Sequence, residues 1–183
     1  FRQTYPDGLV LSRETGFSRN YGNNPYIGYD DVNEPPFLYQ GPILPDELPP
    51  VARVLAVDLG GENVAYPYEV LESWSPINDR VGGVNIVVLW ESGTSSALDS
   101  RIIADGRDVG TAGAFLPEVD GQELSFESIG DSIYDQQTRS QWNSLGMALS
   151  GPLTGTQLPE VVAFNHFWFS WAVFMPETRI YSP

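Results

Sequence analysis

Residues 53–67, RVLAVDLGGENVAYP, decide the fold class of this chain. A mainly apolar run covers Arg53–Leu59, and a second, shorter one covers Val64–Tyr66. Between them lie the turn formers Gly60-Gly61-Glu62-Asn63. Two apolar runs joined by a glycine-rich turn predict a β-hairpin. Pro67 ends the second strand, and it can open a short helix because proline is tolerated in a first helical turn.

Further strands are expected on either side of this hairpin. The β-branched run Val84–Trp90 predicts a central strand covered on both faces. Val109–Phe115 and Glu123–Phe126 alternate with Asp-Gly turn signals and indicate a meander. Thr138–Leu145 can form one or two helical turns, and Val161–Phe174 predicts a buried strand followed by a short helix.

Composition agrees with a β protein. The 183 residues include 18 glycines and 15 prolines without a fixed period, and charged residues are few. We therefore expect a mainly β fold, that is a β-rich α+β domain. Its antiparallel sheet should form a sandwich or a partly closed barrel, with a few short helices. A chain of this length fits one domain over residues 1–183.

Residues 1–50 are expected to be a loop and a proline-rich wrapping segment within that domain, apart from a short strand at Leu9–Leu11. The two ends of the chain also resemble each other. When Phe1 is set against Trp171, Pro6 falls on Pro176 and Val10 on Ile180. Such a match can be coincidence, or it can indicate tandem repeats.

The loop at 15–31, TGFSRNYGNNPYIGYDD, combines tyrosines, asparagines and one arginine between residues that break regular structure. Long loops of this kind are usually functional or disordered, and its apolar surface argues against disorder. It is either an aromatic lid or a binding surface. Arg19 can stack on tyrosines or bind a carboxylate, or it can form an internal ion pair with Asp30 or Asp31. The expected ligand-binding residues are Arg19, Tyr21, Asn24, Tyr26, Tyr29 and Asp135.

The net charge is −15, from 24 acidic residues and nine basic ones, all of them arginine. Nucleic acids and anionic membrane surfaces are therefore poor partners, whereas a protein partner or self-association is compatible with this charge. An acidic surface without lysine suits high salt, although biased composition or chance can produce the same pattern. The apolar run near the C-terminus is too short and too interrupted to insert into a membrane.

With no cysteine and one histidine, the chain lacks the ligands of a usual transition-metal site, and we expect no cofactor. His166 lies among aromatic residues and is more consistent with a core or boundary side chain than with a base. Calcium is a weaker option, because oxygen ligands lie close together in one stretch, although their spacing matches no calcium loop. These residues are Asp30, Asp31, Asn33 and Glu34.

Six stretches along the chain form a recognisable pattern. They are YPDGLVLSRETGFSRNYGNNPYIGYDD, RVLAVDLGGENVAYPYEVL, INDRVGG, SALDSR, IYDQQTRSQWNSLGMALSGPLTGTQL and the ending W-x-x-W-x-x-F-x-P-E-T. Together they resemble the domain of unknown function 3179 family. The resemblance implies a mostly β domain of bacterial and archaeal proteins, many with secretion signals, and hence an extracytoplasmic location. Many members carry cysteines after the central strand, whereas LWESGTSSALD here has none. The positions that match by motif are Thr15, Gly16, Arg19, Tyr21, Pro25, Tyr26, Asn78, Asp79, Asp135, Thr138, Ser140 and Trp142.

No activity comes with this resemblance. Our first hypothesis is a non-catalytic extracytoplasmic β domain that binds a ligand or partner through the Arg19 loop, or that is a subunit of a larger assembly. The alternative is a cysteine-independent, hydrolase-like enzyme with a polar pocket near Arg19, Asp135 and His166. Asp135, Thr138 and Ser140 either cap the expected short helix or converge with the loop at one pocket.

Overall fold

The computed structural model describes residues 5–183, and the predicted hairpin forms its first sheet. Strand β1 (Arg53–Leu59) pairs with β2 (Glu62–Pro67) across Gly60 and Gly61, which both adopt positive φ angles. Strand β12 (Ala163–Phe167) extends the sheet beyond β1, and β13 (Arg179–Ile180) runs parallel to β2 at the other edge. The hairpin prediction is confirmed.

The second sheet contains β3 (Ile77–Val81), β4 (Val84–Glu91) and β5 (Thr111–Phe115), in that order. Side chains of β4 alternate between two interiors, because successive residues of a strand point to opposite faces. Ile86 and Val88 join the core beneath the first sheet, whereas Val87 and Leu89 join a separate core on the other side. The expected central strand covered on both faces is therefore confirmed.

A third sheet has the order β11-β10-β9-β8 and closes the second core, with a small hairpin of β6 and β7 beside it. Its strands are short. They are β6 (Glu118–Val119), β7 (Gln122–Glu123), β8 (Phe126–Ile129), β9 (Ser132–Asp135), β10 (Gln141–Trp142) and β11 (Ala148–Ser150). The helix expected within residues 138–145 is wrong, since this stretch holds β10 and a turn stabilised by the Asp135 carboxylate.

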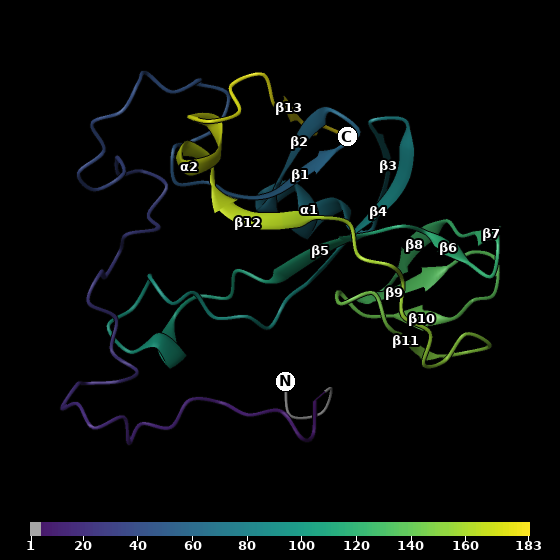
Figure 1. The fold of residues 1–183 in the computed structure, drawn as a ribbon, viewed down its shortest axis with the longest axis horizontal. Helices are drawn as coiled ribbons and strands as arrows, with labels where there is room; N and C mark the ends of the chain where they lie inside the picture. The colour runs from purple at the N-terminus through teal and green to yellow at the C-terminus, as the bar shows by residue number, and fades with distance from the viewer. Residues whose placement is uncertain (1–4) are drawn as a thin grey trace.

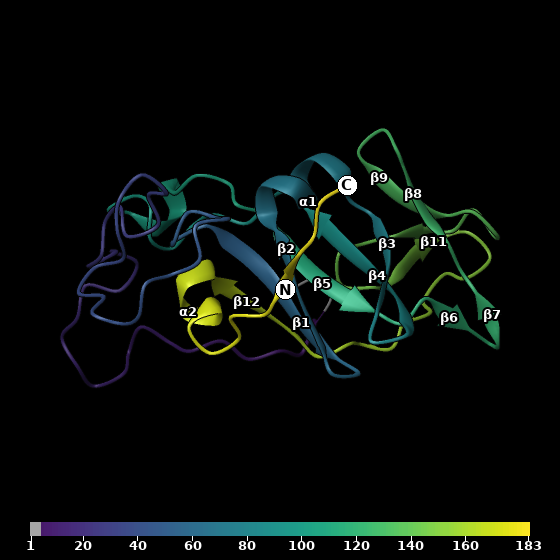
Figure 2. The same cartoon turned by 90° about the horizontal axis from the view of Figure 1, so that it is seen from above.

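Two short α-helices complete the layers. Helix α1 (Tyr68–Trp74) follows β2, as Pro67 predicts, and buries Leu71 in the core between the first two sheets. Helix α2 (Trp168–Ala172) follows β12 and packs Trp168 and Ala172 on the outer face of the first sheet. Figure 2 shows the resulting succession of α2, the β12-β1-β2 strands, β3–β5 and the third sheet. The chain is thus mainly β, with open, predominantly antiparallel sheets in layers.

Strand β12 differs from its prediction in one respect. It was expected to be buried, yet it lies at the edge of its sheet, and the Phe164 side chain is 60% exposed. An apolar composition did not distinguish an edge position from a central one, because an edge strand needs only one neighbour. The short helix after it ends before Pro176 as predicted.

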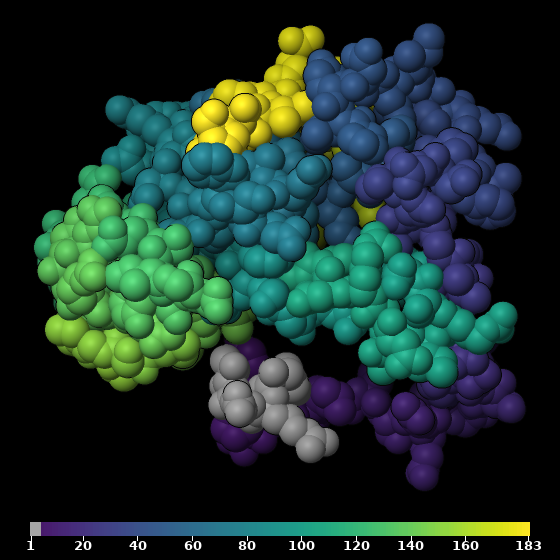
Figure 3. All heavy atoms as spheres, turned by 180° about the vertical axis from the view of Figure 1, so that it is seen from behind, coloured from purple at the N-terminus to yellow at the C-terminus, as the bar shows by residue number. Residues whose placement is uncertain are grey.

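Residues 5–50 contain no helix and no extended strand, which agrees with a loop and proline-rich segment. The strand expected at Leu9–Leu11 is wrong: these three side chains are exposed and have no strand beside them. Figure 1 shows the segment running along the outside of the molecule, and Figure 3 shows its purple and violet atoms at one side of the teal body. A 3-10 turn at Ile103–Asp105 lies near its middle part.

The two ends that match in sequence have different environments. Residues 179–180 form β13 on the β2 edge, whereas the matching residues 9–10 are exposed. Phe1, which begins the match with Trp171, lies outside the described residues. Neither helix within residues 5–183 has both the length and the apolar character needed to cross a membrane.

Candidate functional site

The later half of the 15–31 loop is fixed to the segment that follows β4. The Asn24 backbone N–H donates to the Arg101 carbonyl at 2.8 Å, and the Gly28 N–H donates to the Leu98 carbonyl at 2.8 Å. Asn23 forms an isolated antiparallel bridge with Ile102. These contacts join segments about 75 positions apart in the sequence. This part of the loop is therefore packed against the body of the protein.

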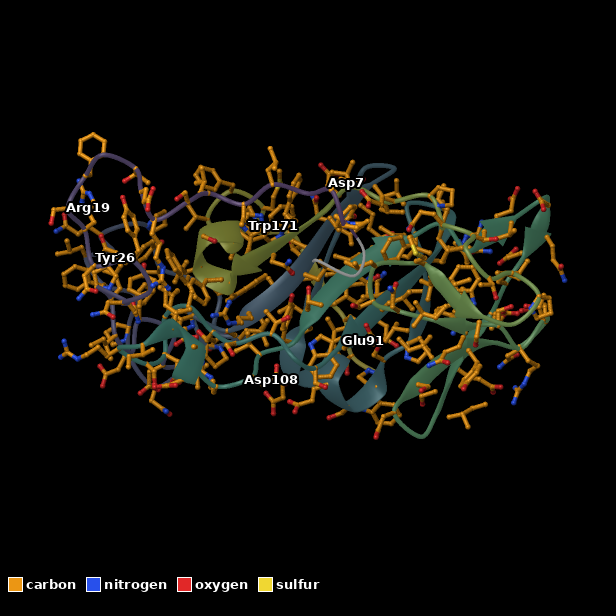
Figure 4. All side chains as sticks on the ribbon, turned by 90° about the horizontal axis from the view of Figure 1, so that it is seen from below. Asp7, Arg19, Tyr26, Glu91, Asp108 and Trp171 are labelled. Carbon is orange, nitrogen blue, oxygen red and sulfur yellow. The ribbon has the colours of Figure 1, made fainter. Side chains whose placement is uncertain are left out.

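Arg19 lies at one end of the molecule, beyond these contacts (Figure 4). Its guanidinium makes no hydrogen bond or ion pair with any residue that the structure describes, so the expected pairing with Asp30 or Asp31 does not form. Tyr21 is 37% exposed, and its hydroxyl is 2.5 Å from Thr15 Oγ1. Arg19 and Tyr21 are therefore presented to solvent.

The other expected loop residues lie closer to the sheets. Asn24 is buried, and its Oδ1 accepts from the Tyr26 N–H at 2.7 Å. The Tyr26 and Tyr29 rings meet edge to face at 6.4 Å, and the Tyr29 ring lies 5.9 Å from that of Phe167. Tyr26 and Tyr29 also line a cavity of about 530 Å³ between residues 25–29 and 34–38. Tyr29 thus joins the loop to β12.

Asp30 is the centre of the best-defined polar cluster. Its carboxylate is fully buried and accepts from Arg53 Nη2 at 2.8 Å and from Ser96 Oγ at 2.5 Å. Arg107 donates to Asp30 Oδ1 at 3.2 Å and to the Asp30 carbonyl at 2.9 Å. Two guanidiniums from distant segments therefore hold one carboxylate, which ties the loop to β1 and to the stretch before β5.

The environment of Asp30 keeps it ionised. Burial alone raises the pKa of this carboxyl, but hydrogen bonds from Ser96 and Arg53 and the charges of Arg107 and Arg53 outweigh that effect. The pKa of Asp30 is therefore below its ordinary value. The sequence suggested Asp30 as a calcium ligand and did not single out Arg53 or Arg107. The one signal for this cluster was Arg53, a charged residue at the start of an apolar strand.

The four residues of the calcium hypothesis do not form one site in the structure. Asp30 faces the two arginines, whereas Asp31 Oδ1 accepts from the Asn33 N–H and from Asn33 Nδ2. Glu34 lines the cavity beside Tyr26. Within residues 5–183, no three acidic or histidine side chains are grouped as a metal site requires. The two acidic neighbours therefore have separate structural roles.

A cavity of about 300 Å³ opens beside the Asp30 cluster, between the wrapping segment, β1, α1 and the loop before β5. Its polar lining includes Asp30, Arg53, Arg107, Asp108, Glu69 and Glu72. Its apolar lining includes Leu48, Pro49, Val51, Tyr68, Trp90 and Val109. The volume lies at the lower end of the range of about 300–1,000 Å³ typical of small-molecule sites.

The Asp108 carboxylate and the hydroxyl at the tip of Tyr68 are both fixed by other contacts. The Asp108 carboxylate accepts backbone N–H groups of Gly93, Thr94 and Gly110 at 2.7–3.0 Å, and these bonds lower its pKa. The Tyr68 hydroxyl donates to Asn165 Oδ1 at 2.5 Å, and burial raises its pKa to about 12. Figure 4 shows Asp108 beside α1, at a distance from Arg19. The wall is therefore preorganised.

A second cavity, of about 500 Å³, lies between α1, the end of β4 and the β8–β9 hairpin. It shares Glu72, Trp90 and Ser92 with the first cavity, so the two adjoin at these residues. The rest of its lining is mainly polar: Ser73, Ser75, Glu91, Ser128, Gly130, Asp131, Ser132 and Ile133. Neither Asp135 nor His166 lines either cavity.

Asp135 belongs to a closed network at the β9–β10 turn. Its carboxylate accepts from Trp142 Nε1, from the Thr138 N–H and hydroxyl, and from the Ser140 N–H at 2.5–3.1 Å. Burial raises the pKa of this group, but those donors outweigh it and leave the pKa lowered. Asp135, Thr138 and Ser140 therefore contact one another. They neither cap a helix nor meet the 15–31 loop at a pocket.

His166, on β12, is half-buried between the rings of Phe164 and Trp171, at 6.3 and 5.3 Å. Burial lowers the pKa of its imidazole. No hydrogen bond, ion pair or ring contact of the described residues joins His166 to Arg19 or Asp135. The three residues of the enzyme hypothesis thus occupy different parts of the fold.

A family model described as a protein of unknown function, DUF3179, matches residues 1–178, nearly the whole chain. The chain belongs to the DUF3179 family. No curated protein and no solved structure matches this DUF3179 chain. The family description supplies no activity, so functional reasoning depends on the geometry described above.

Two further motif residues of this DUF3179 chain link its layers. Asn78 on β3 donates from Nδ2 to the Phe126 carbonyl at 2.8 Å and accepts from the Phe126 N–H at 2.9 Å, which joins β3 to β8. Asp79 accepts from the buried Tyr66 hydroxyl at 2.8 Å and from Arg179 at 3.1 Å. These side chains link layers of the fold and line neither of the two adjoining cavities, which we take as the candidate site.

Proposed function

We propose that this chain is a non-catalytic, ligand-binding β domain whose site is the pair of cavities that meet at Trp90. The observation that carries the proposal is the preorganised wall of the first cavity, where Asp30, Arg53 and Arg107 fix the wrapping segment onto the sheet. Binding sites are typically concave and apolar, with a few fixed polar groups. This site replaces the Arg19 loop as the expected binding surface.

A binding role is better supported than hydrolysis. A catalytic group must contact the substrate, and the residues of the enzyme hypothesis do not share a cavity among those described above. Asp135 uses its carboxylate oxygens on neighbouring donors, and Arg19 lies at the end of the molecule. The extracytoplasmic location is part of the proposal and depends on the family resemblance.

The proposal is tested by blocking the point where the cavities meet. Ser92 is exposed and lines both, so Ser92→Trp should obstruct them without disturbing the core. Ser95→Trp, at an exposed position outside both linings, is the matched control. A panel of neutral, cationic and anionic small molecules is screened by the shift in melting temperature. We expect a shift for the natural chain and the control that Ser92→Trp loses; no shift with any compound would refute a binding role.

A second role, as a subunit of a larger assembly, is favoured by the N-terminal segment. Leu9, Leu11 and Ile43 are 95–101% exposed, and Phe17, Phe37 and Leu38 are also largely exposed. Large apolar side chains exposed along one segment are candidates for burial against a partner. The match between residues 6–12 and the β13 segment favours a second unit of the same fold as the partner.

A further inference from the structure

The cavity between residues 25–29 and 34–38 has no role in the function proposed above. Its volume is about 530 Å³, and it shares no lining residue with the two cavities that meet at Trp90. Figure 4 shows Tyr26, in its wall, near one end of the molecule and away from Asp108 of the first cavity. It is therefore a separate concave site, of a volume typical of small-molecule sites.

Three aromatic rings line this cavity. Tyr26 and Tyr29 belong to one wall and Phe37 to the other. The Tyr26 and Tyr29 rings have centroids 6.4 Å apart and planes inclined by 69°. Rings set nearly at right angles can each present a face to one guest. Tyr26 and Phe37 are 58% and 66% exposed, so a ligand can reach both rings.

Both walls are anchored to the body of the protein. The Tyr29 ring packs on Phe167 of β12 at 5.9 Å. In the other wall, the carbonyl of the buried Pro36 accepts from the Tyr39 N–H at 3.1 Å, and the Tyr39 ring meets Phe169 of α2 at 5.6 Å. The aromatic cavity is therefore formed before any ligand binds, which reduces the entropic cost of binding.

The charge of this cavity is negative. Among the residues that the structure describes, Glu34 is the one charged residue of the lining, and its carboxylate makes no hydrogen bond or ion pair with any of them. Arg53 and Arg107, which contact Asp30 next to Tyr29, are already paired with carboxylates. The chain as a whole carries a charge of −15. An anionic ligand is therefore disfavoured and a cation is favoured.

The lining also distinguishes between kinds of cation. A calcium ion takes six to eight oxygen ligands, whereas this lining supplies one carboxylate. A primary ammonium is strongly hydrated and brings three N–H donors that need acceptors. A quaternary ammonium has no N–H donor to satisfy, and its positive charge is attracted by the faces of aromatic rings.

We propose that this cavity binds a small quaternary ammonium ion, with its N-methyl groups against Tyr26, Tyr29 and Phe37 and its charge near Glu34. The inference goes beyond the function proposed above, because it assigns a second site that is independent of Trp90. It gives the aromatic part of the 15–31 loop a ligand that Arg19 does not contact.

The test follows backbone amide resonances of the full chain by nuclear magnetic resonance during titration with choline and with tetramethylammonium. The neutral analogue 3,3-dimethylbutan-1-ol has the shape of choline without its charge, and sodium chloride controls for ionic strength. We expect both ammonium ions, but neither control compound, to shift resonances within residues 25–29 and 34–38. Equal binding of the neutral analogue would overturn the ligand class, and no shift with either ammonium would overturn the site.

Substitutions test the contribution of each group. Tyr26→Leu should weaken choline binding about fivefold, the effect of one exposed cation–π contact, whereas Tyr26→Phe should retain it. Phe17→Leu, at a 71% exposed position of the same loop outside the lining, is the control and should have no effect. Glu34→Gln should weaken binding about threefold, and the exposed Glu47→Gln should not.

Ser92→Trp separates this site from the one at Trp90. Choline binding should be unchanged in this variant, because Ser92 does not line the aromatic cavity. Loss of choline binding in Ser92→Trp, with no effect of Tyr26→Leu, would place the ammonium ion at Trp90 and overturn the inference. The binding function at Trp90 is judged separately, by the compound panel described above.

Discussion

Asp30 and Arg53, 23 positions apart, form a 2.8 Å ion pair that fastens the N-terminal loop to the first residue of β1. Asp30→Asn would leave two guanidiniums without their buried counter-charge. Because both arginines remain partly exposed, we expect a loss of about 2 kcal/mol in the free energy of unfolding, below the cost of breaking a fully buried pair. Urea unfolding measures it, and the exposed neighbour Asp31→Asn should cause little change.

The pH dependence of stability follows from the same pair. The pKa of Asp30 is lowered in the folded state, so its contribution is present above the ordinary carboxyl pKa and is lost as the pH falls through the folded value. Stability of the natural chain should therefore fall on acidification more steeply than that of Asp30→Asn. Unfolding midpoints measured at neutral and acidic pH provide the comparison, and parallel curves would contradict it.

Asp135→Asn tests the turn that replaced the expected helix. The amide keeps the size of the side chain but turns one acceptor oxygen into a donor, which would face donors of Thr138, Ser140 and Trp142. We expect a loss of about 2 kcal/mol, because buried polar groups left unpaired cost this order of free energy. Chemical unfolding with Asp131→Asn as the control measures the effect; equal midpoints would show that the carboxylate does not hold the turn.

Gly110→Ala tests the position of Trp90. The added methyl group would lie 2.2 Å from the indole, at a φ of +69°. Gly61→Ala, at a φ of +83° with open space around it, separates the backbone effect from the clash. The control should lose about 1 kcal/mol from its backbone conformation, and Gly110→Ala clearly more. Near-ultraviolet circular dichroism should change for Gly110→Ala alone.

Tyr68 should ionise at a higher pH than an ordinary tyrosine. Its pKa is raised from 10.0 to about 12, chiefly by burial, so the folded state retains the phenolic proton longer than the unfolded chain. The contribution of protonated Tyr68 to the free energy of unfolding is complete below pH 10 and is lost as the pH rises towards about 12. Spectrophotometric titration should show a tyrosine that ionises near pH 12 and is absent in Tyr68→Phe. Loss of an ordinary tyrosine near pH 10 in this variant would contradict the burial of Tyr68.

The exposed leucines of the N-terminal segment should affect association and not folding. The double change Leu9→Ser and Leu11→Ser removes side chains that are 95% and 97% exposed, so the melting temperature should stay the same. If the segment binds a second unit, sedimentation of the natural chain should show concentration-dependent self-association that this variant loses. A natural chain that remains monomeric at all concentrations would contradict the subunit role.

Local pattern was enough to predict much of the fold. The glycine turn at Gly60–Gly61, the apolar run of β4 and the proline before α1 each act within a few residues. Residues 138–145 were misjudged because the side chain that decides their conformation, Asp135, competes for the N–H groups that a helix would use.

The candidate site was harder to predict. Asp30 meets Arg53 and Arg107 across 23 and 77 positions, and the acidic cluster around Asp30 suggested calcium instead. Trp90 was assigned correctly to the core strand, but nothing local indicated that its indole borders two cavities. A contact of this kind depends on which turns bring the strand ends together. Sequence reasoning favoured Arg19 because aromatic neighbours along the chain are visible, whereas neighbours in space are not.

The alternation of β4 has a consequence for how the molecule comes apart. Ile86 and Val88 complete one interior while Val87 and Leu89 complete the other, so withdrawing this single strand empties both at once. The two cores on either side of β4 should therefore unfold together on heating. Calorimetry should record a single cooperative transition and not two separate ones.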